Sequence, residues 1–78
     1  MPWFTCTVPK AGPAENGVIY IALRATDGSF YHWFQAVPNM EKEMLATALV
    51  AISGGKLVDC LLTDSVAYST INRLYVRE

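Results

Sequence analysis

Residues 44–52 constrain the fold more than any other segment, because eight of these nine residues are apolar and only Thr47 is polar. A helix that is apolar on all sides is usually buried on all sides. Five residues recur at helical spacing and are expected to face a sheet, namely Met44, Leu45, Ala48, Leu49 and Ile52. The apolar residues left for the other faces of the helix are Ala46, Val50 and Ala51.

Two explanations account for this second face of the helix. In the first, the alanines tolerate water and only Val50 needs an explanation, since alanine is a strong helix former. In the second, the face that carries Ala46, Val50 and Ala51 packs against another copy of the chain. Closed rings and dimers are the commonest arrangements of identical chains, so the second explanation predicts a homo-oligomer.

The ends of the helix follow from residues with known capping behaviour. We predict a helix over residues 40–52, in which Asn39 accepts a backbone N–H as the N-cap and Glu41 lies in the first turn. The sequence Ser53-Gly54-Gly55 is expected to end the helix, because glycine takes the left-handed C-terminal conformation without a steric penalty.

The composition favours a subunit that hides part of its surface. The chain has 78 residues and is expected to form a single domain over residues 1–78. Hydrophobic residues make up 53% and charged residues only 17%, although so small a domain has much surface to keep wet. The net charge is −1 and the six basic residues are scattered, which disfavours binding to nucleic acid.

Membrane and export signals are not recognised in the chain as given. It contains no apolar run of about 18 residues, and its start lacks a basic segment followed by an apolar one. We therefore expect a cytoplasmic protein without a membrane span, and a secreted mature form stays open.

The remaining segments alternate between strand and turn patterns. Strands are predicted over residues 3–8, 17–26, 29–37, 56–63 and 70–77, with a loop over residues 9–16. Asp27-Gly28 predicts a type I′ hairpin turn between the second and third strands. The order of three strands, one helix and two strands predicts an α+β, mainly β fold. We expect a five-stranded antiparallel barrel of the OB type with the helix between strands three and four; an open antiparallel sheet with the helix across one face is the alternative.

Residues able to carry out catalysis or bind metal are few. His32 is the only histidine and has no carboxylate near it in sequence, so we expect it to be structural or exposed. In the predicted barrel the first strand pairs with the fourth, which would bring Cys6 near Cys60; buried thiols and a disulfide both stay open. We expect no enzyme, no metal site and no cofactor.

The aromatic residues are the better functional lead. Alternation along the third strand places Tyr31 and Trp33 on one face and Phe30, His32 and Phe34 on the other. One set must enter the core, and the other forms a subunit interface or a ligand surface, because tryptophan and tyrosine join a large apolar body to a polar tip. The candidate aromatic residues for such a surface are Trp3, Tyr20, Tyr31 and Trp33.

The helix followed by SGGKLVDCLL, residues 53–62, resembles small OB-fold proteins related to the B subunits of AB5 toxins. In those chains a central helix ends in a glycine-lysine turn and leads into the fourth strand. The resemblance covers the whole chain as a pattern and implies a ring, typically a homopentamer, with helices lining a central channel. It also implies glycan binding on the ring surface, although no residue here matches a family binding motif.

Taken together, these observations predict a non-enzymatic, self-associating binding or interaction module. The expected partner is the chain itself, as a pentamer or a dimer, with carbohydrate as a further candidate. The alternative is a protein that binds a glycan or another small ligand. A single-stranded nucleic-acid binder comes third, because OB-folds often bind such ligands but this chain lacks a basic cluster.

Overall fold

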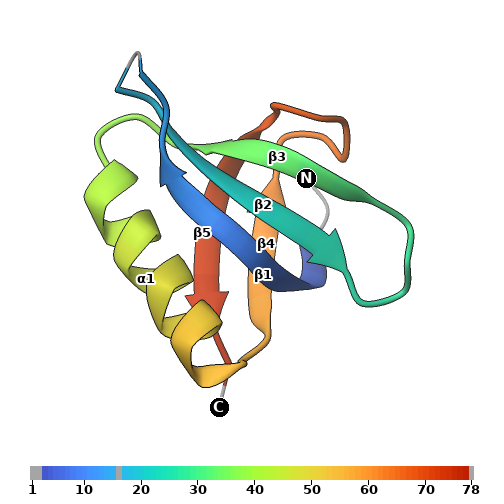
Figure 1. Ribbon diagram of the computed structural model, residues 1–78. Coiled ribbons are helices and arrows are strands. Elements are labelled where there is room, and N and C mark those ends of the chain that lie inside the picture. Colours follow the sequence, from blue (N-terminus) through green and yellow to red (C-terminus); the bar gives the residue numbers. More distant parts are fainter. Residues whose placement is uncertain (1–2, 16, 78) are drawn as a thin grey trace.

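The computed structural model describes residues 3–15 and 17–77 and contains three strands, one helix and two further strands in that order (Figure 1). This order confirms the predicted arrangement. The elements are β1 (Trp3–Pro13), β2 (Ile19–Ala25), β3 (Tyr31–Ala36), α1 (Glu41–Gly54), β4 (Val58–Leu62) and β5 (Thr70–Val76).

The five strands close into a barrel with the neighbour order β1-β2-β3-β5-β4 and with β1 paired to β4. The prediction that every pair is antiparallel was wrong. Strands β3 and β5 run parallel, with Gln35 opposite Thr70 and Ala36 opposite Ile71. A closed ring of five strands cannot alternate in direction at every step, so at least one neighbouring pair must be parallel.

Strand β1 is longer than predicted, because it extends through Pro13 and residues 10–13 pair with β2 instead of forming a loop. The pairing register shifts between Thr7 and Lys10, which is a β-bulge. Pro9 lies within this shift. A bulge is one of the positions in a sheet that tolerate proline, which has no N–H to donate. Pro13 is the last residue of the strand and pairs with Ile19 beside the turn.

The β2–β3 connection is a hairpin, but the type I′ turn predicted for it was wrong. Gly28 has φ +81°, whereas Asp27 does not have a positive φ, and a type I′ turn needs both. The N–H of Gly28 donates to the carbonyl of Ala25 at 3.0 Å. The Oδ1 of Asp27 accepts the N–H of Ser29 at 2.9 Å. The loop is therefore longer than two residues and is held by the aspartate side chain.

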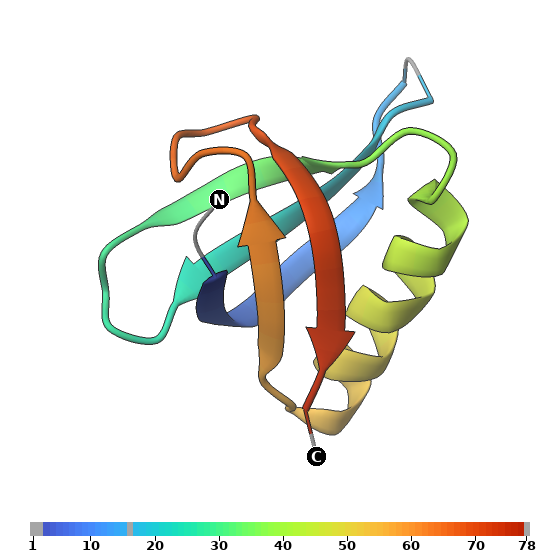
Figure 2. The same ribbon diagram turned by 180° about the vertical axis from the view of Figure 1, so that it is seen from behind.

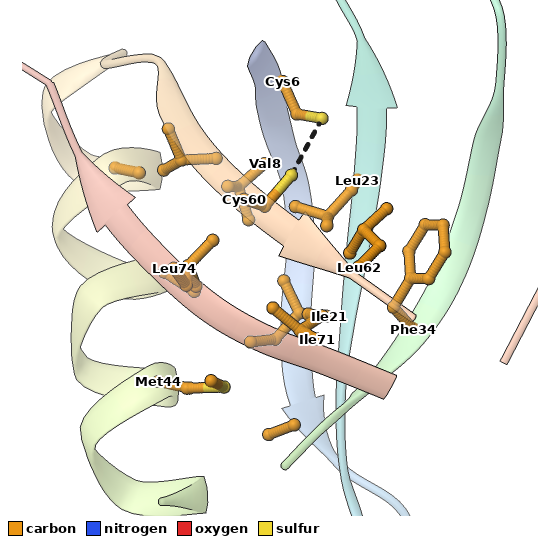
Figure 3. Close-up of a cluster of buried hydrophobic side chains, with 14 of the residues drawn as sticks. Cys6, Val8, Ile21, Leu23, Phe34, Met44, Cys60, Leu62, Ile71 and Leu74 are labelled. Carbon is orange, nitrogen blue, oxygen red and sulfur yellow. Dashed lines mark hydrogen bonds between the residues drawn. The ribbon is translucent and has the colours of Figure 1, made fainter. Parts of the chain in front are cut away.

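The core fills the barrel and extends to the inner side of α1 (Figure 3). All five strands contribute to it. The largest fully buried side chains are Phe34, Ile21, Leu23, Leu62, Ile71, Val58, Cys6 and Cys60. Phe30 and Phe34 are buried, whereas Tyr31 and Trp33 are not, so the predicted division of the third strand into two faces is confirmed for these four residues. His32, predicted on the side of Phe30 and Phe34, is exposed.

The helix starts and ends close to the predicted residues, but its N-cap is Met40 and not Asn39. Asn39 has φ +74° and follows Pro38 in a turn closed by the N–H of Met40 and the carbonyl of Val37 at 3.2 Å. This is the position that asparagine favours in a type II turn. Met40 is consequently the N-cap and makes no side-chain capping bond. At the other end Gly55 takes the left-handed conformation with φ +62°, as predicted.

The side of the helix that packs on the barrel overlaps the predicted side but is rotated from it, since Met44 and Ala48 are buried as predicted. Its buried residues are Met44, Ala48 and Ala51, so Ala51 belongs to the core with 2% exposure and not to the second face. Leu49 and Ile52, which were predicted to face the sheet, are exposed. Alanine at two of the three contact positions allows the helix axis to approach the strands closely.

The outer side of α1 is not covered by any other element in either view of the molecule (Figures 1 and 2). Within residues 3–15 and 17–77, no helix is long and apolar enough to cross a bilayer.

Candidate functional site

Strands β1, β2 and β3 place nine residues in three rows on the outside of the barrel. Ile21 and Leu23 are fully buried, so their neighbours on β2 point outward, and residues directly opposite in a ladder share a face. The rows are Thr7–Arg24–Tyr31, Lys10–Ala22–Trp33 and Gly12–Tyr20–Gln35. We call these nine residues the outer sheet face.

A pocket of about 470 Å³ lies at one end of the outer sheet face. Three aromatic residues line it, Tyr20, Trp33 and Tyr68, together with residues 11–14 of the β1–β2 hairpin. The rings of Tyr20 and Tyr68 are nearly perpendicular, with centroids 5.7 Å apart. A Cβ atom at Gly12 would meet no atom within 4 Å, so the glycine keeps this side of the pocket open.

Tyr68 reaches the pocket from the loop between β4 and β5, which is fastened to β3. Its N–H donates to the carbonyl of Trp33 at 2.6 Å. Its carbonyl accepts the Nε2 of Gln35 at 3.1 Å. Tyr68 has φ +66°, a conformation that costs a residue with a Cβ roughly 1–2 kcal/mol. These two hydrogen bonds compensate for that cost and place the ring opposite Tyr20.

Sequence reasoning brought forward three residues that the structure places together, Tyr20, Tyr31 and Trp33. It did not single out Tyr68, because nothing local to residues 63–69 shows that this loop returns to β3. Trp3 does not join the group. It stacks on Tyr75 of β5 with centroids 5.8 Å apart, and neither residue lines the pocket.

The outer sheet face carries positive charge although the chain as a whole is slightly acidic. Lys10 and Arg24 are both exposed, and none of the nine residues is acidic. The Cζ atom of Arg24 lies 5.7 Å from the centroid of the Tyr31 ring, within the range of a cation–π contact. Arg24 therefore lies beside an aromatic ring, whereas Lys10 is separated from Trp33 by Ala22 in its row.

A second exposed surface is the outer side of α1. Leu49, Val50 and Ile52 have 48%, 52% and 40% of their area exposed, and Ala46 is exposed beside them. We call these four residues the outer helix face. It keeps two of the residues predicted for it, Ala46 and Val50, and replaces Ala51 by Leu49 and Ile52.

The two cysteines lie inside the barrel and face each other (Figure 3). Their Sγ atoms are 3.3 Å apart and both thiols are free and buried. The hydrogen bond to Cys6 and burial both raise the pKa of the Cys60 thiol, so Cys60 is kept as a neutral thiol. His32 is exposed beside Phe30. The described residues hold no group of three or more His, Cys, Asp or Glu able to bind a metal.

Comparisons with protein-family models, with curated proteins and with solved structures found no match. The outer helix face and the pocket are therefore interpreted from the residues of this chain.

Proposed function

We propose that the protein is a non-enzymatic, self-associating module built on an OB-like barrel, and that copies of it assemble through the outer helix face. The neighbour order β1-β2-β3-β5-β4 and the position of α1 between β3 and β4 support the OB-like assignment. The resemblance to ring-forming B subunits supports the assembly, with a pentamer as the ring it implies and a dimer as the simpler alternative.

The observation that carries this proposal is the exposure of Leu49, Val50 and Ile52 around the part of α1 that faces away from the barrel. Each square ångström of apolar surface withdrawn from water contributes roughly 25 cal/mol, and contiguous apolar patches commonly mark interaction sites. The low share of charged residues, 17%, supports a chain that hides surface in an assembly.

The helix dipole favours a second copy as the occupant of this face, because two helices packed in antiparallel orientation align their dipoles favourably. The charged side chains of the first turn add little to this, since Lys42 lies between Glu41 and Glu43. Lys42 also shares the outer side of the helix with Ala46, four residues later. The apolar residues of the face therefore carry the association.

Native mass tests the proposal. We expect light scattering on a size-exclusion column at low micromolar concentration to give a multiple of 8.6 kDa. Val50→Asp should lower this mass toward a single chain while the circular dichroism spectrum is retained. Val66→Asp is the matched control, because Val66 has 55% exposure and lies on the β4–β5 loop. A wild-type monomer, or an unchanged mass for Val50→Asp, would contradict the proposal.

A second function is supported by the pocket, namely binding of a ring-shaped small ligand such as a sugar. Three aromatic residues line the pocket and no lining residue is charged, which suits stacking on a flat apolar ring face. Tryptophan fluorescence during titration with saccharides tests this. Trp33→Ala should abolish a response that Trp3→Ala preserves, because Trp3 lies outside the pocket. A response lost in both variants or in neither would count against the pocket.

A further inference from the structure

We propose that the outer sheet face binds a short single-stranded nucleic acid, with bases stacked in and beside the pocket and phosphates near Lys10 and Arg24. This inference rests on the second proposed function, that the pocket takes a ring, and it names the class of molecule to which the ring belongs.

The spacing of the aromatic rings supports unstacked bases. Trp33 and Tyr31 are two residues apart on the same side of β3, which corresponds to about 7 Å along a strand. Both are exposed, Trp33 by 37% and Tyr31 by 50%. Successive bases reach rings at this spacing only when they are spread apart, as they are in single strands bound on aromatic platforms.

The charges of the outer sheet face support a ligand that carries phosphates. Lys10 is in the same row as Trp33, and Arg24 is in the same row as Tyr31, so each ring has one cation beside it or one residue away. Among the described residues, the acid closest in sequence to the pocket lining is Glu15, next to Ala14 in the β1–β2 loop.

A neutral sugar fits the polar groups of the pocket less well. Recognition of sugar hydroxyls needs directed donors and acceptors, and no carboxylate lines the pocket. The amide nitrogen of Gln35, the residue opposite Tyr20, already donates to the carbonyl of Tyr68. The side-chain hydrogen-bonding groups that line the pocket are therefore only the single polar atoms of Tyr20, Trp33 and Tyr68. Base stacking needs only ring faces and tolerates any base sequence, so the residues favour a nucleobase over a sugar.

Two cations predict a specific dependence of affinity on salt. Single strands release counterions with a slope of about −0.7 per neutralised phosphate in a plot of log affinity against log salt. Two contacts give a slope of about −1.4, so binding should weaken about sevenfold between 50 and 200 mM salt. Loss of one stacked base costs about 1–3 kcal/mol, which is at least about fivefold in affinity.

Fluorescence anisotropy of a labelled eight-nucleotide oligothymidylate, titrated with the full chain at several NaCl concentrations, tests the inference. Lys10→Ala should reduce the slope to about −0.7, whereas Lys56→Ala, the control, should leave it unchanged. Trp33→Ala should weaken binding at least about fivefold at an unchanged slope. If Trp33→Ala fails to fold, Gly12→Trp replaces it, because it places a large side chain at the lining of the pocket while every aromatic residue is kept.

The outcomes separate this inference from the proposed functions. Binding with no salt dependence, or binding unaffected by Trp33→Ala and by Gly12→Trp, overturns the inference. No oligonucleotide binding, with a neutral oligosaccharide bound at Trp33, overturns it but leaves the pocket as a ligand site. No binding of either class overturns both. The native-mass experiment on the outer helix face is independent of all three.

Discussion

Oxidation of Cys6 and Cys60 should join the two thiols in a disulfide and stabilise the barrel. The Sγ atoms are 3.3 Å apart, and a disulfide bond is about 2.05 Å long, so side-chain rotation has to bring them together by only about 1 Å. Cys6 lies on β1 and Cys60 on β4, the pair that closes the barrel. The opposite partners are Val58 for Cys6 and Phe4 for Cys60, so the two cysteines are diagonal neighbours across this seam.

The expected gain follows from the length of chain that the bond encloses. The two residues are 54 positions apart, and a loop of this length lowers the entropy of the unfolded chain by an amount worth about 4 kcal/mol at 25 °C. For 78 residues the unfolding entropy is about 0.16 kcal/mol/K, so the Tm should rise by about 25 °C. Strain in the bonded form subtracts from this figure.

Because both thiols are fully buried, the protein is best refolded with a thiol oxidant such as diamide. Intact mass should show the loss of two hydrogen atoms, and thermal unfolding followed by circular dichroism should give a higher Tm without reductant than with it. Cys60→Ala, the control, should show neither difference. Absence of the mass change after refolding would refute the proximity argument. A completed bond with an unchanged Tm would refute the argument from loop entropy.

Three further perturbations test the packing, the helix end and the one described ion pair. Leu62→Ala should lower the free energy of unfolding by about 3 kcal/mol in urea titration, because the side chain is fully buried and leaves a cavity. Gly55→Ala should lower the free energy of unfolding by about 1 kcal/mol, because Gly55 has φ +62°. Gly12→Ala is the control and should be near neutral. An added Cβ meets no atom within 4 Å at either glycine, but Gly12 has no positive φ. Asp59 accepts a hydrogen bond from Arg77 at 3.0 Å, which lowers the pKa of the carboxyl. Its contribution should therefore be present at pH 7 and lost as the pH falls through the folded-state pKa. Wild type should be more stable than Asp59→Asn at pH 7, and this advantage should shrink as the pH falls below the usual pKa of aspartate. An advantage that does not change with falling pH would contradict the assignment.

Local physical chemistry in the sequence was sufficient for the order of elements and for several of their ends. Gly55 ends the helix in the left-handed conformation, as expected from the freedom that glycine has at positive φ. Alternation on the third strand correctly separated Phe34, inside, from Trp33, outside, because side chains of a strand point to opposite faces in turn. These features depend on residues close together in the chain.

The candidate ligand site was predictable only in part. Tyr20 and Trp33 were recognised as candidates, and the pairing of β2 with β3 places them on one face. Tyr68 completes the pocket only because the β4–β5 loop is hydrogen-bonded to β3. No periodicity in residues 63–69 reports a contact with a strand more than 30 positions earlier.

The side of the helix that packs on the barrel is the feature that the sequence predicted least well. The apolar residues of the helix lie on all sides, so the sequence did not determine which side meets the barrel. Tertiary packing chose the side with Met44, Ala48 and Ala51, where small residues permit a close approach, and left Leu49 and Ile52 outside. The parallel β3–β5 pair has a similar origin. Each strand is specified by its own residues, but the direction of its neighbours is decided by closing five strands into one ring.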